Sequence, residues 1–244
     1  MRAFLEKINN EWLDDFVYMS KYRFIDRGID VIPFDGDNLS TLFKHNPKIG
    51  DVCIGSVEAT TKFFEYIEIK TPEYLGYPES LRKWLKRNIT EITFGETEGM
   101  SYPYFIKPSK GVKQFTGSLV ENNNQRNILK TYYNVSDDTQ LYLSDCIDFK
   151  SEFRCFVHNG KLEGIHWYAG DFKLFPNVDD VEQMIKDFTN PPISYTLDVG
   201  VTKFGTALIE VNDFWAIGSY GFDAKKYVKM SIDRFLEIYK NNKI

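Results

Sequence analysis

The sequence is poor in the residues that build disulfide frameworks and zinc sites. Its 244 residues include only three cysteines and three histidines. The cysteines are odd in number and form no Cys-x-x-Cys pair, which is typical of reduced thiols in a cytosolic protein. The histidines are too few and too scattered for a histidine-rich metal site. Disulfide-stabilised and histidine-based metal-binding classes are therefore disfavoured.

Long apolar runs are also missing. No stretch approaches the ~20 apolar residues that cross a bilayer. The segment "MRAFLEKINNEWLDD" is charged and lacks the apolar core of a signal peptide. A net charge of -5 argues against a general polyanion-binding surface, although a local basic pocket is compatible with it. We therefore expect a cytoplasmic protein that binds neither membranes nor nucleic acids in general.

What is present is an ordinary globular composition, with 43% hydrophobic and 27% charged residues. Without internal repeats or a low-complexity linker, domain boundaries follow from changes in pattern. Up to residue 88, short strand patterns such as "IDVIPFD" alternate with helical ones such as "SVEATTKFFEYI", which Ser56 is placed to cap. This alternation predicts a small α/β N-terminal domain over residues 1–88.

From Ile89 onward, strand patterns dominate. The Asn159-Gly160 pair between two apolar runs is a strong hairpin signal. "SYTLDVGV" and "TALIEVN" predict two further strands, joined around Gly205, and residues 223–240 form a closing amphipathic helix pattern. Residues 89–244 are therefore expected to form an α+β domain.

Lys107 is the first of several polar residues that interrupt these strands. It lies in "FIKPSKGVKQFTG", where a strand runs into a loop containing Lys113. A strand lysine followed by a donor-rich loop suits a phosphate clamp. The commoner reading of such a lysine is a solvated side chain, and the loop does not match the GxxxxGK[ST] pattern of P-loop proteins.

Arg154 lies in the apolar strand pattern "SEFRCFV". Burying an arginine there is costly without an anionic partner. Two interpretations stay open from the residues alone. Arg154 either binds an anionic ligand or forms a purely structural ion pair with Glu152 or Asp198.

Glu210 and Asn212 end the strand "ALIEVN" on the same face, because side chains two positions apart in a strand point the same way. For a single carboxylate, a solvent-facing edge is the commoner explanation. If the strand pairs with "YTLDVGV", however, Asp198 joins them at one end of one sheet. Three oxygen donors of this kind suit Mg²⁺ together with substrate phosphates.

The order of these features resembles the ATP-grasp superfamily over residues 89–244, and in finer detail its R2K clade. "FIKPSKGVKQFTGS" is similar to the family's lysine strand and phosphate-covering loop, and "TLDVGVTKFGTALIEVND" to its metal-binding hairpin. "LYLSDCIDFKSEFRCFV" looks like the segment that joins the two lobes. The resemblance implies an ATP-grasp fold with two lobes, residues 89–143 and 144–244, that carry mixed or antiparallel sheets.

The resemblance also implies roles for single residues. Lys107 would contact the α and β phosphates of ATP, with Lys113 as a helper, and Arg154 would stabilise the transferring γ-phosphate or an acyl phosphate. Mg²⁺ would be held by Asp198, Glu210 and Asn212. The adenine would meet the backbone of Ser144, Asp145, Cys146 and Ile147, and the ribose would meet Asp148. Lys70 and Arg87 are both candidates for a further basic phosphate ligand.

The activity implied is that of an ATP-dependent carboxylate–amine ligase. ATP would phosphorylate a carboxylate, and an amine would then displace phosphate to form an amide or peptide bond on an amino acid, peptide or protein tail. Two alternatives are a small-molecule kinase, which stops at phosphoryl transfer, and a non-catalytic nucleotide-binding module. The resemblance leaves the substrates and the oligomeric state open.

Overall fold

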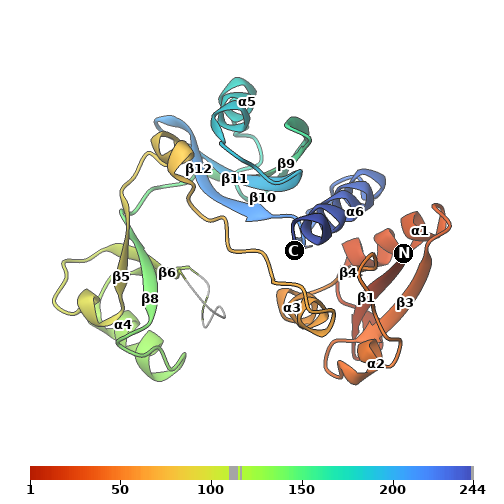
Figure 1. Ribbon diagram of the computed structural model, residues 1–244. Coiled ribbons are helices and arrows are strands. Elements are labelled where there is room, and N and C mark those ends of the chain that lie inside the picture. The colour runs from red at the N-terminus through yellow and green to blue at the C-terminus, as the bar shows by residue number, and fades with distance from the viewer. Residues whose placement is uncertain (110–114, 116, 243–244) are drawn as a thin grey trace. The chain divides into compact units, whose positions relative to one another are not determined.

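The computed structural model describes residues 1–109, 115 and 117–242 (Figure 1). The chain forms two compact units. The first unit combines Met1–Trp84 with Lys150–Ile244, and the second is the continuous stretch Leu85–Phe149. The domain boundaries expected from the sequence, at residues 88/89 and 143/144, stay a prediction.

The first unit begins with a mainly parallel sheet. Its central strand β1 (Arg2–Ile8) pairs in parallel with β3 (Asp30–Asp35) and β4 (Val52–Ile54), and β2 (Glu11–Trp12) adds an antiparallel edge. The connecting helices are α1 (Asp15–Ile25), α2 (Ser40–Phe43) and α3 (Val57–Tyr66). As expected, Ser56 caps α3, since its hydroxyl accepts the backbone N–H of Ala59 at 3.1 Å.

The remainder of the first unit is built on an antiparallel sheet of strand order β10-β9-β11-β12. These strands are β9 (Ser151–His158), β10 (Lys161–Gly170), β11 (Ser194–Thr202) and β12 (Gly205–Asp213). The 3-10 helix η1 (Glu79–Trp84), α5 (Val178–Asp187) and α6 (Ala224–Asn241) complete the unit. The predicted hairpin turn between β9 and β10 is confirmed, with positive φ angles at Asn159 and Gly160.

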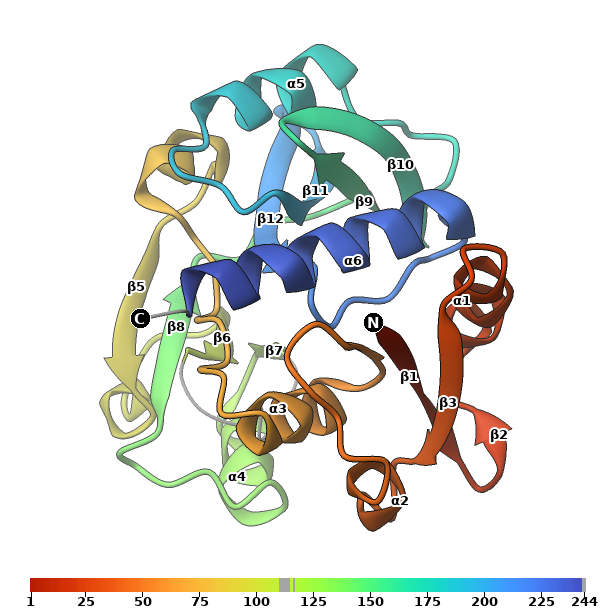
Figure 2. The same ribbon diagram turned by 45° about the vertical axis from the view of Figure 1, so that its right-hand side comes forward.

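One aromatic core joins the N-terminal sheet to the C-terminal helix. Figure 2 shows α6 lying across the first unit, beside α1. Phe64 of α3 stacks on Phe235 of α6 with ring centroids 5.2 Å apart, and both rings are buried. The Tyr239 hydroxyl of α6 donates a hydrogen bond to the backbone carbonyl of Asp51. The two ends of the chain are therefore parts of one packed structure.

The second unit is a smaller antiparallel sheet of order β5-β8-β6-β7. Its elements are β5 (Ile89–Thr93), η2 (Gly95–Thr97), β6 (Tyr104–Pro108), β7 (Ser118–Val120), α4 (Asn123–Thr131) and β8 (Gln140–Ser144). A core around Phe94, Ile106 and Leu141 fills it. The mixture of parallel and antiparallel sheets with packed helices confirms the α+β class.

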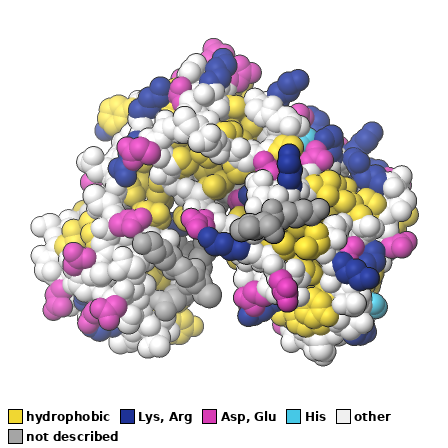
Figure 3. All heavy atoms as spheres, viewed as in Figure 1, with side chains coloured by type: hydrophobic (Ala, Val, Ile, Leu, Met, Phe, Trp, Pro, Cys, Tyr) yellow, Lys and Arg dark blue, Asp and Glu magenta, His cyan; other side chains and the backbone are white. Residues whose placement is uncertain are grey.

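In Figure 3, charged side chains of both signs are interspersed with hydrophobic ones rather than gathered into a patch of one sign. Among the described residues, every helix is too short or too polar to span a membrane.

Candidate active site

A row of polar side chains crosses the four-stranded sheet of the first unit. In the strand register, His166 of β10 lies opposite Arg154 of β9, Arg154 opposite Asp198 of β11, and Asp198 opposite Glu210 of β12. Residues directly opposite each other in neighbouring strands project from the same face of a sheet. The four side chains therefore form one row on one face.

The centre of this row is a buried ion pair. Arg154 Nε and Nη2 donate to Oδ1 and Oδ2 of Asp198, each at 2.8 Å, and the two residues are only 7% and 2% exposed. This two-point geometry is the strong form of an arginine–carboxylate contact. Of the two structural partners considered from the sequence, Asp198 is therefore the one that Arg154 meets.

The loop after β12 covers the same guanidinium. Arg154 Nη1 donates to the carbonyl oxygen of Gly218 at 3.2 Å, and the ring of Tyr220 lies 4.6 Å from the guanidinium carbon. Burial alone would lower the pKa of Arg154, but the hydrogen bonds and charge of Asp198 outweigh burial and raise it. The guanidinium is therefore a fixed positive charge.

Two further oxygen-bearing side chains lie next to the ion pair. Asn212 Nδ2 donates to Oδ2 of Asp198 at 3.2 Å, and Glu210 faces Asp198 across the strand pair. A bulge follows at once, because Val199 pairs with Leu208 and leaves Ile209 as the extra residue. The structure thus brings together Asp198, Glu210 and Asn212, and their binding of a metal ion stays a prediction.

Glu210 has a partner that the sequence pattern did not reveal. The Tyr74 hydroxyl donates to Glu210 Oε2 at 2.6 Å. The backbone of Gly76 exchanges two hydrogen bonds with Val211, at 3.1 and 2.9 Å, and so places this segment along the outer edge of β12. Gly76 has a φ of +53°, and a Cβ there would lie 2.6 Å from the Tyr74 ring. In the sequence, the only hint of this contact is that Gly76 follows Tyr74 by two positions.

The donor set of this site suits a hard cation. Two carboxylates and one amide oxygen are the ligands that Mg²⁺ accepts alongside water and phosphate oxygens. The described residues contain no group of three His, Cys, Asp or Glu side chains placed to hold a metal. In this hairpin the third oxygen donor would be the amide of Asn212, whose nitrogen is turned toward Asp198.

Most of the predicted nucleotide-binding residues lie in the second unit. Arg87 Nε donates to Ser144 Oγ at 3.1 Å, and its guanidinium lies 5.5 Å from the ring of Phe149. The Asp145 carboxylate accepts two hydrogen bonds from Asn88, one from its backbone and one from its side chain. The structure therefore brings Arg87 to the end of β8, where the predicted adenine-binding stretch begins.

The remaining described residues that were predicted to bind the nucleotide lie after β8, on β6 and in the first unit. Cys146, Ile147 and Asp148 follow β8 in a stretch without regular structure. Lys107 is half-buried on β6, opposite Tyr142 of β8. Lys70 belongs to the first unit, where it pairs at the surface with Glu73 at 2.9 Å. Lys113 lies outside the described residues.

Sequence comparison assigns the chain to a family. Residues 84–230 match the family described as "ATP-grasp domain, R2K clade family 2", and the chain therefore belongs to this ATP-grasp family. The resemblance identified from the sequence is confirmed for both the superfamily and the clade. No curated protein sequence matches the chain.

Solved structures of ATP-grasp enzymes share the fold over the full chain. D-alanine–D-alanine ligase from Bacillus anthracis is similar with a TM-score of 0.59 and 15% identity over 99% of both chains. A RimK domain ATP-grasp protein from Sphaerobacter thermophilus has a TM-score of 0.59 and 13% identity over 98% of this chain and 99% of its own. L-amino acid ligase from Bacillus licheniformis has a TM-score of 0.54 and 15% identity, covering 99% of this chain and 74% of its own.

Proposed function

We propose that the protein is an ATP- and Mg²⁺-dependent carboxylate–amine ligase that forms an amide or peptide bond through an acyl phosphate. The observation that carries the proposal is the buried arginine of the β9–β12 sheet. Arg154 is fixed by Asp198 beside the oxygen donors Glu210 and Asn212, in a chain of an ATP-grasp family. The fold shared with two amino acid ligases also supports a ligase function.

Arg154 has the hydrogen-bonding capacity for this role. An arginine side chain carries five N–H groups. The contacts to Asp198 and Gly218 use three of them. The other two are available to an oxygen of the transferring phosphate or of the acyl phosphate. Because Asp198 holds the guanidinium in place, little reorganisation would be needed as negative charge develops there.

The remaining residues would bind and position ATP. In the second unit, Lys107 and Arg87 would neutralise phosphate charge with Lys113, and the stretch from Ser144 to Asp148 would bind adenine and ribose. In the first unit, Asp198, Glu210 and Asn212 would hold Mg²⁺, which supplies charge neutralisation at the phosphates when it is bound. Phosphoryl transfer depends on such positioning and charge rather than on a protein nucleophile.

Titration calorimetry with Mg²⁺ and ATP tests the nucleotide part of the proposal. Glu210→Gln and Lys107→Met should each weaken binding by roughly tenfold or more, the loss expected for one charge-assisted contact. Glu65→Gln and Lys130→Met change exposed ion pairs of the first and second unit and serve as matched controls. Equal affinities in all five proteins, or an affinity that does not depend on Mg²⁺, would contradict the site.

Product analysis then tests the reaction. Phosphate release from ATP should require a carboxylate and an amine together, and the product should contain a new amide bond. Phosphoryl transfer to an alcohol without any amine would instead identify a kinase. Nucleotide binding without turnover over a broad panel of acids and amines would identify a binding module.

A further inference from the structure

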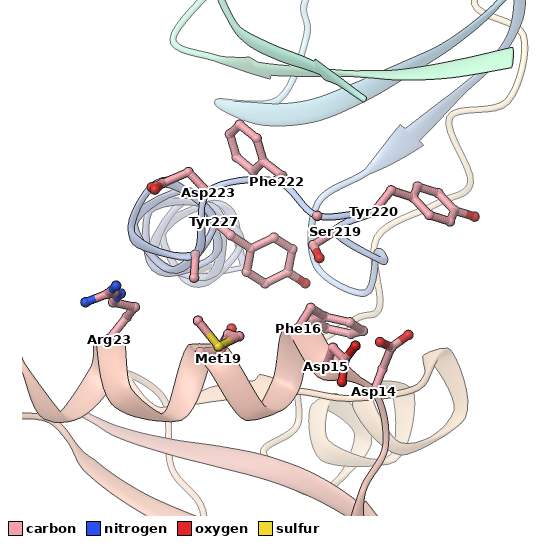
Figure 4. A pocket seen from close by; sticks show the side chains of 13 residues that line it. Asp14, Asp15, Phe16, Met19, Arg23, Ser219, Tyr220, Phe222, Asp223 and Tyr227 are labelled. Carbon is pink, nitrogen blue, oxygen red and sulfur yellow. The ribbon is translucent and has the colours of Figure 1, made fainter. Parts of the chain in front are cut away.

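Helix α1 borders a cavity on each of two flanks. The larger one, about 520 Å³, lies between α1 and the loop that leads from β12 to α6 (Figure 4). Tyr220 lines it and also covers Arg154, so this cavity adjoins the proposed reaction site. The smaller one, about 340 Å³, lies between α1 and strands β2 and β3, and we call it the β3 cavity. It is lined by Lys21 and Ile25 of α1, by Trp12, and by residues 28–31 and 33.

The β3 cavity extends along the strand that names it. In the strand register, Trp12 of β2 lies opposite Lys7 of β1. Asp30 of β3 lies opposite Arg2 of the same strand. Lys7 and Arg2 are five positions apart, which is about 16 Å at the ~3.3 Å rise per residue of a strand. Trp12 and Asp30 therefore mark two ends of an elongated space, whose volume is within the ~300–1,000 Å³ usual for small-molecule sites.

One end of the β3 cavity is basic and aromatic. Lys21 is half-buried, and its Nζ lies 5.5 Å from the centroid of the Trp12 ring. Lys7 Nζ lies 4.9 Å from the same ring. Lys7 donates to the neutral amide of Asn10 at 3.3 Å, and neither ammonium group forms an ion pair within the described part of the chain. Two positive charges at one indole therefore suit an anionic ligand group.

The wall between the two ends is apolar. Ile25 contributes from α1, Ile29 from the turn that follows it, and Val31 and Pro33 from β3. Val31 and Pro33 are two positions apart in the strand, so they project from the same face. Ile25 is 52% exposed although it borders this hollow. An unbranched hydrocarbon chain laid along the wall would remove these apolar surfaces from water, which favours binding.

The far end of the β3 cavity carries the opposite charge. Asp30 begins β3 and lines the cavity there. Its carboxylate repels an anion, whereas Lys21 and Lys7 attract one at the Trp12 end. A ligand with one anionic group is therefore oriented by the cavity, with that group at Lys21 and its uncharged end toward Asp30. A ligand with an anionic group at each end is disfavoured.

We propose that the β3 cavity is a second ligand site, which binds a monocarboxylic acid with an unbranched apolar chain. The carboxylate lies at Lys21 and Lys7, beside the Trp12 ring, and the chain lies along Ile25, Ile29 and Val31. All of these residues belong to the N-terminal part of the first unit. The site is additional to the ligase function proposed above and does not depend on it.

Calorimetric titration of the full chain with four probes tests the ligand class. The probes are octanoate, hexanoate, 1-octanol and suberate, the eight-carbon dicarboxylate. Octanoate should bind at least tenfold more tightly than 1-octanol, which lacks the charge, and than suberate, whose second carboxylate meets the apolar wall or Asp30. Hexanoate should bind roughly tenfold more weakly than octanoate, because each buried methylene group contributes about fourfold in affinity.

Variants of single residues test the place and orientation of the ligand. Lys21→Met should weaken octanoate binding roughly tenfold or more and leave 1-octanol binding unchanged, the pattern expected when one charge-assisted contact is lost. Lys62→Met, which changes an exposed ion pair of α3, is the matched control. Asp30→Asn should strengthen suberate binding and leave octanoate binding unchanged.

The apolar wall has a control of its own. Ile25→Asp places a charge on the wall and should weaken octanoate binding at least tenfold. Ile128→Asp changes an isoleucine of α4 that is equally exposed, at 52%, and should bind octanoate as the wild type does. The proposal is overturned if octanoate does not bind, if 1-octanol or suberate binds equally well, or if Lys21→Met and Ile25→Asp retain the affinity of the wild type.

Discussion

The hydroxyl of Tyr74 donates a 2.6 Å hydrogen bond to Glu210, although 136 positions separate the two residues. Replacing Tyr74 with Phe should leave the Glu210 carboxylate less well oriented. Because this contact is near the surface, we expect a loss of about 1 kcal/mol, or roughly fivefold in affinity for Mg²⁺ and ATP. Titration calorimetry at fixed ATP and varied Mg²⁺ measures it.

Tyr66→Phe is the matched control for that variant, since Tyr66 donates its hydroxyl hydrogen bond to Asn46 in a different part of the first unit. It should leave the Mg²⁺ dependence unchanged. If Tyr74→Phe shows the same Mg²⁺ dependence as the wild type, the hydrogen bond to Glu210 has no part in metal binding.

The buried pair of Arg154 and Asp198 should be sensitive to the loss of either partner. Arg154→Met leaves a buried carboxylate without its counter-ion, and removal of one member of such a pair costs about 3–5 kcal/mol of unfolding free energy. Urea unfolding measures this loss. The double variant Arg154→Met/Asp198→Leu should cost less than the sum of the single variants, and additive losses would contradict the coupling.

His166 should make the stability of the first unit dependent on pH. Burial between Phe156 and Phe222 lowers the pKa of His166 below its usual value of about 6.5, partly offset by a hydrogen bond with the backbone of Tyr220. The folded protein therefore binds a proton at this histidine less readily than the unfolded chain. The stabilising contribution is present above pH ~6.5 and is lost as pH falls through the folded pKa.

Urea unfolding at intervals between pH 7.5 and 5 tests this expectation. The wild type should lose more unfolding free energy on acidification than His166→Asn does. His45→Asn, which changes an exposed histidine, should follow the wild type. Parallel curves for the wild type and His166→Asn would show that His166 does not contribute.

Gly170, at the end of β10, should not tolerate a side chain. Its φ is +79°, and a Cβ would lie 2.4 Å from the backbone oxygen of Lys150. Gly170→Ala should therefore cost about 3 kcal/mol of unfolding free energy, from the strained conformation and the overlap together. Gly160→Ala, with a φ of +70° but no atom within 4 Å, should cost only about 1 kcal/mol. Equal losses in the two variants would refute the role of the close contact.

Local patterns predicted the parts of the site that depend on neighbouring residues. The alternation of "ALIEVN" placed Glu210 and Asn212 on one face, and the hairpin around Gly205 brought Asp198 beside them. The helix cap at Ser56 and the turn at Asn159-Gly160 followed from the same kind of short-range signal. Each of these features is determined by a few residues that are adjacent in the sequence, so local patterns are enough to predict it.

The features that were missed depend on distant partners. Strand β1 lies at the centre of the parallel sheet, yet its run of residues is interrupted by charges and was not recognised as a strand. Glu6 of β1 is buried. Its burial is tolerated because Ser56, 50 positions later, donates hydrogen bonds to the Glu6 carboxylate from both its backbone and its hydroxyl. Tyr74 is likewise placed by a backbone pairing with β12. Such contacts cannot be predicted from the pattern of neighbouring residues.

The first unit is interrupted in the chain, and this has a consequence for the order of events on the ribosome. Phe64 packs on Phe235, and the two are separated by the whole of the second unit. At a synthesis rate of ~5–20 residues per second, roughly 10 to 30 s pass between the synthesis of Phe64 and that of Phe235. During this time the aromatic face of α3 lacks its partner helix. The second unit is continuous and is complete before that helix emerges. We therefore expect the inserted unit to mature first, while the nascent N-terminal segment is open to chaperones until α6 has been synthesised.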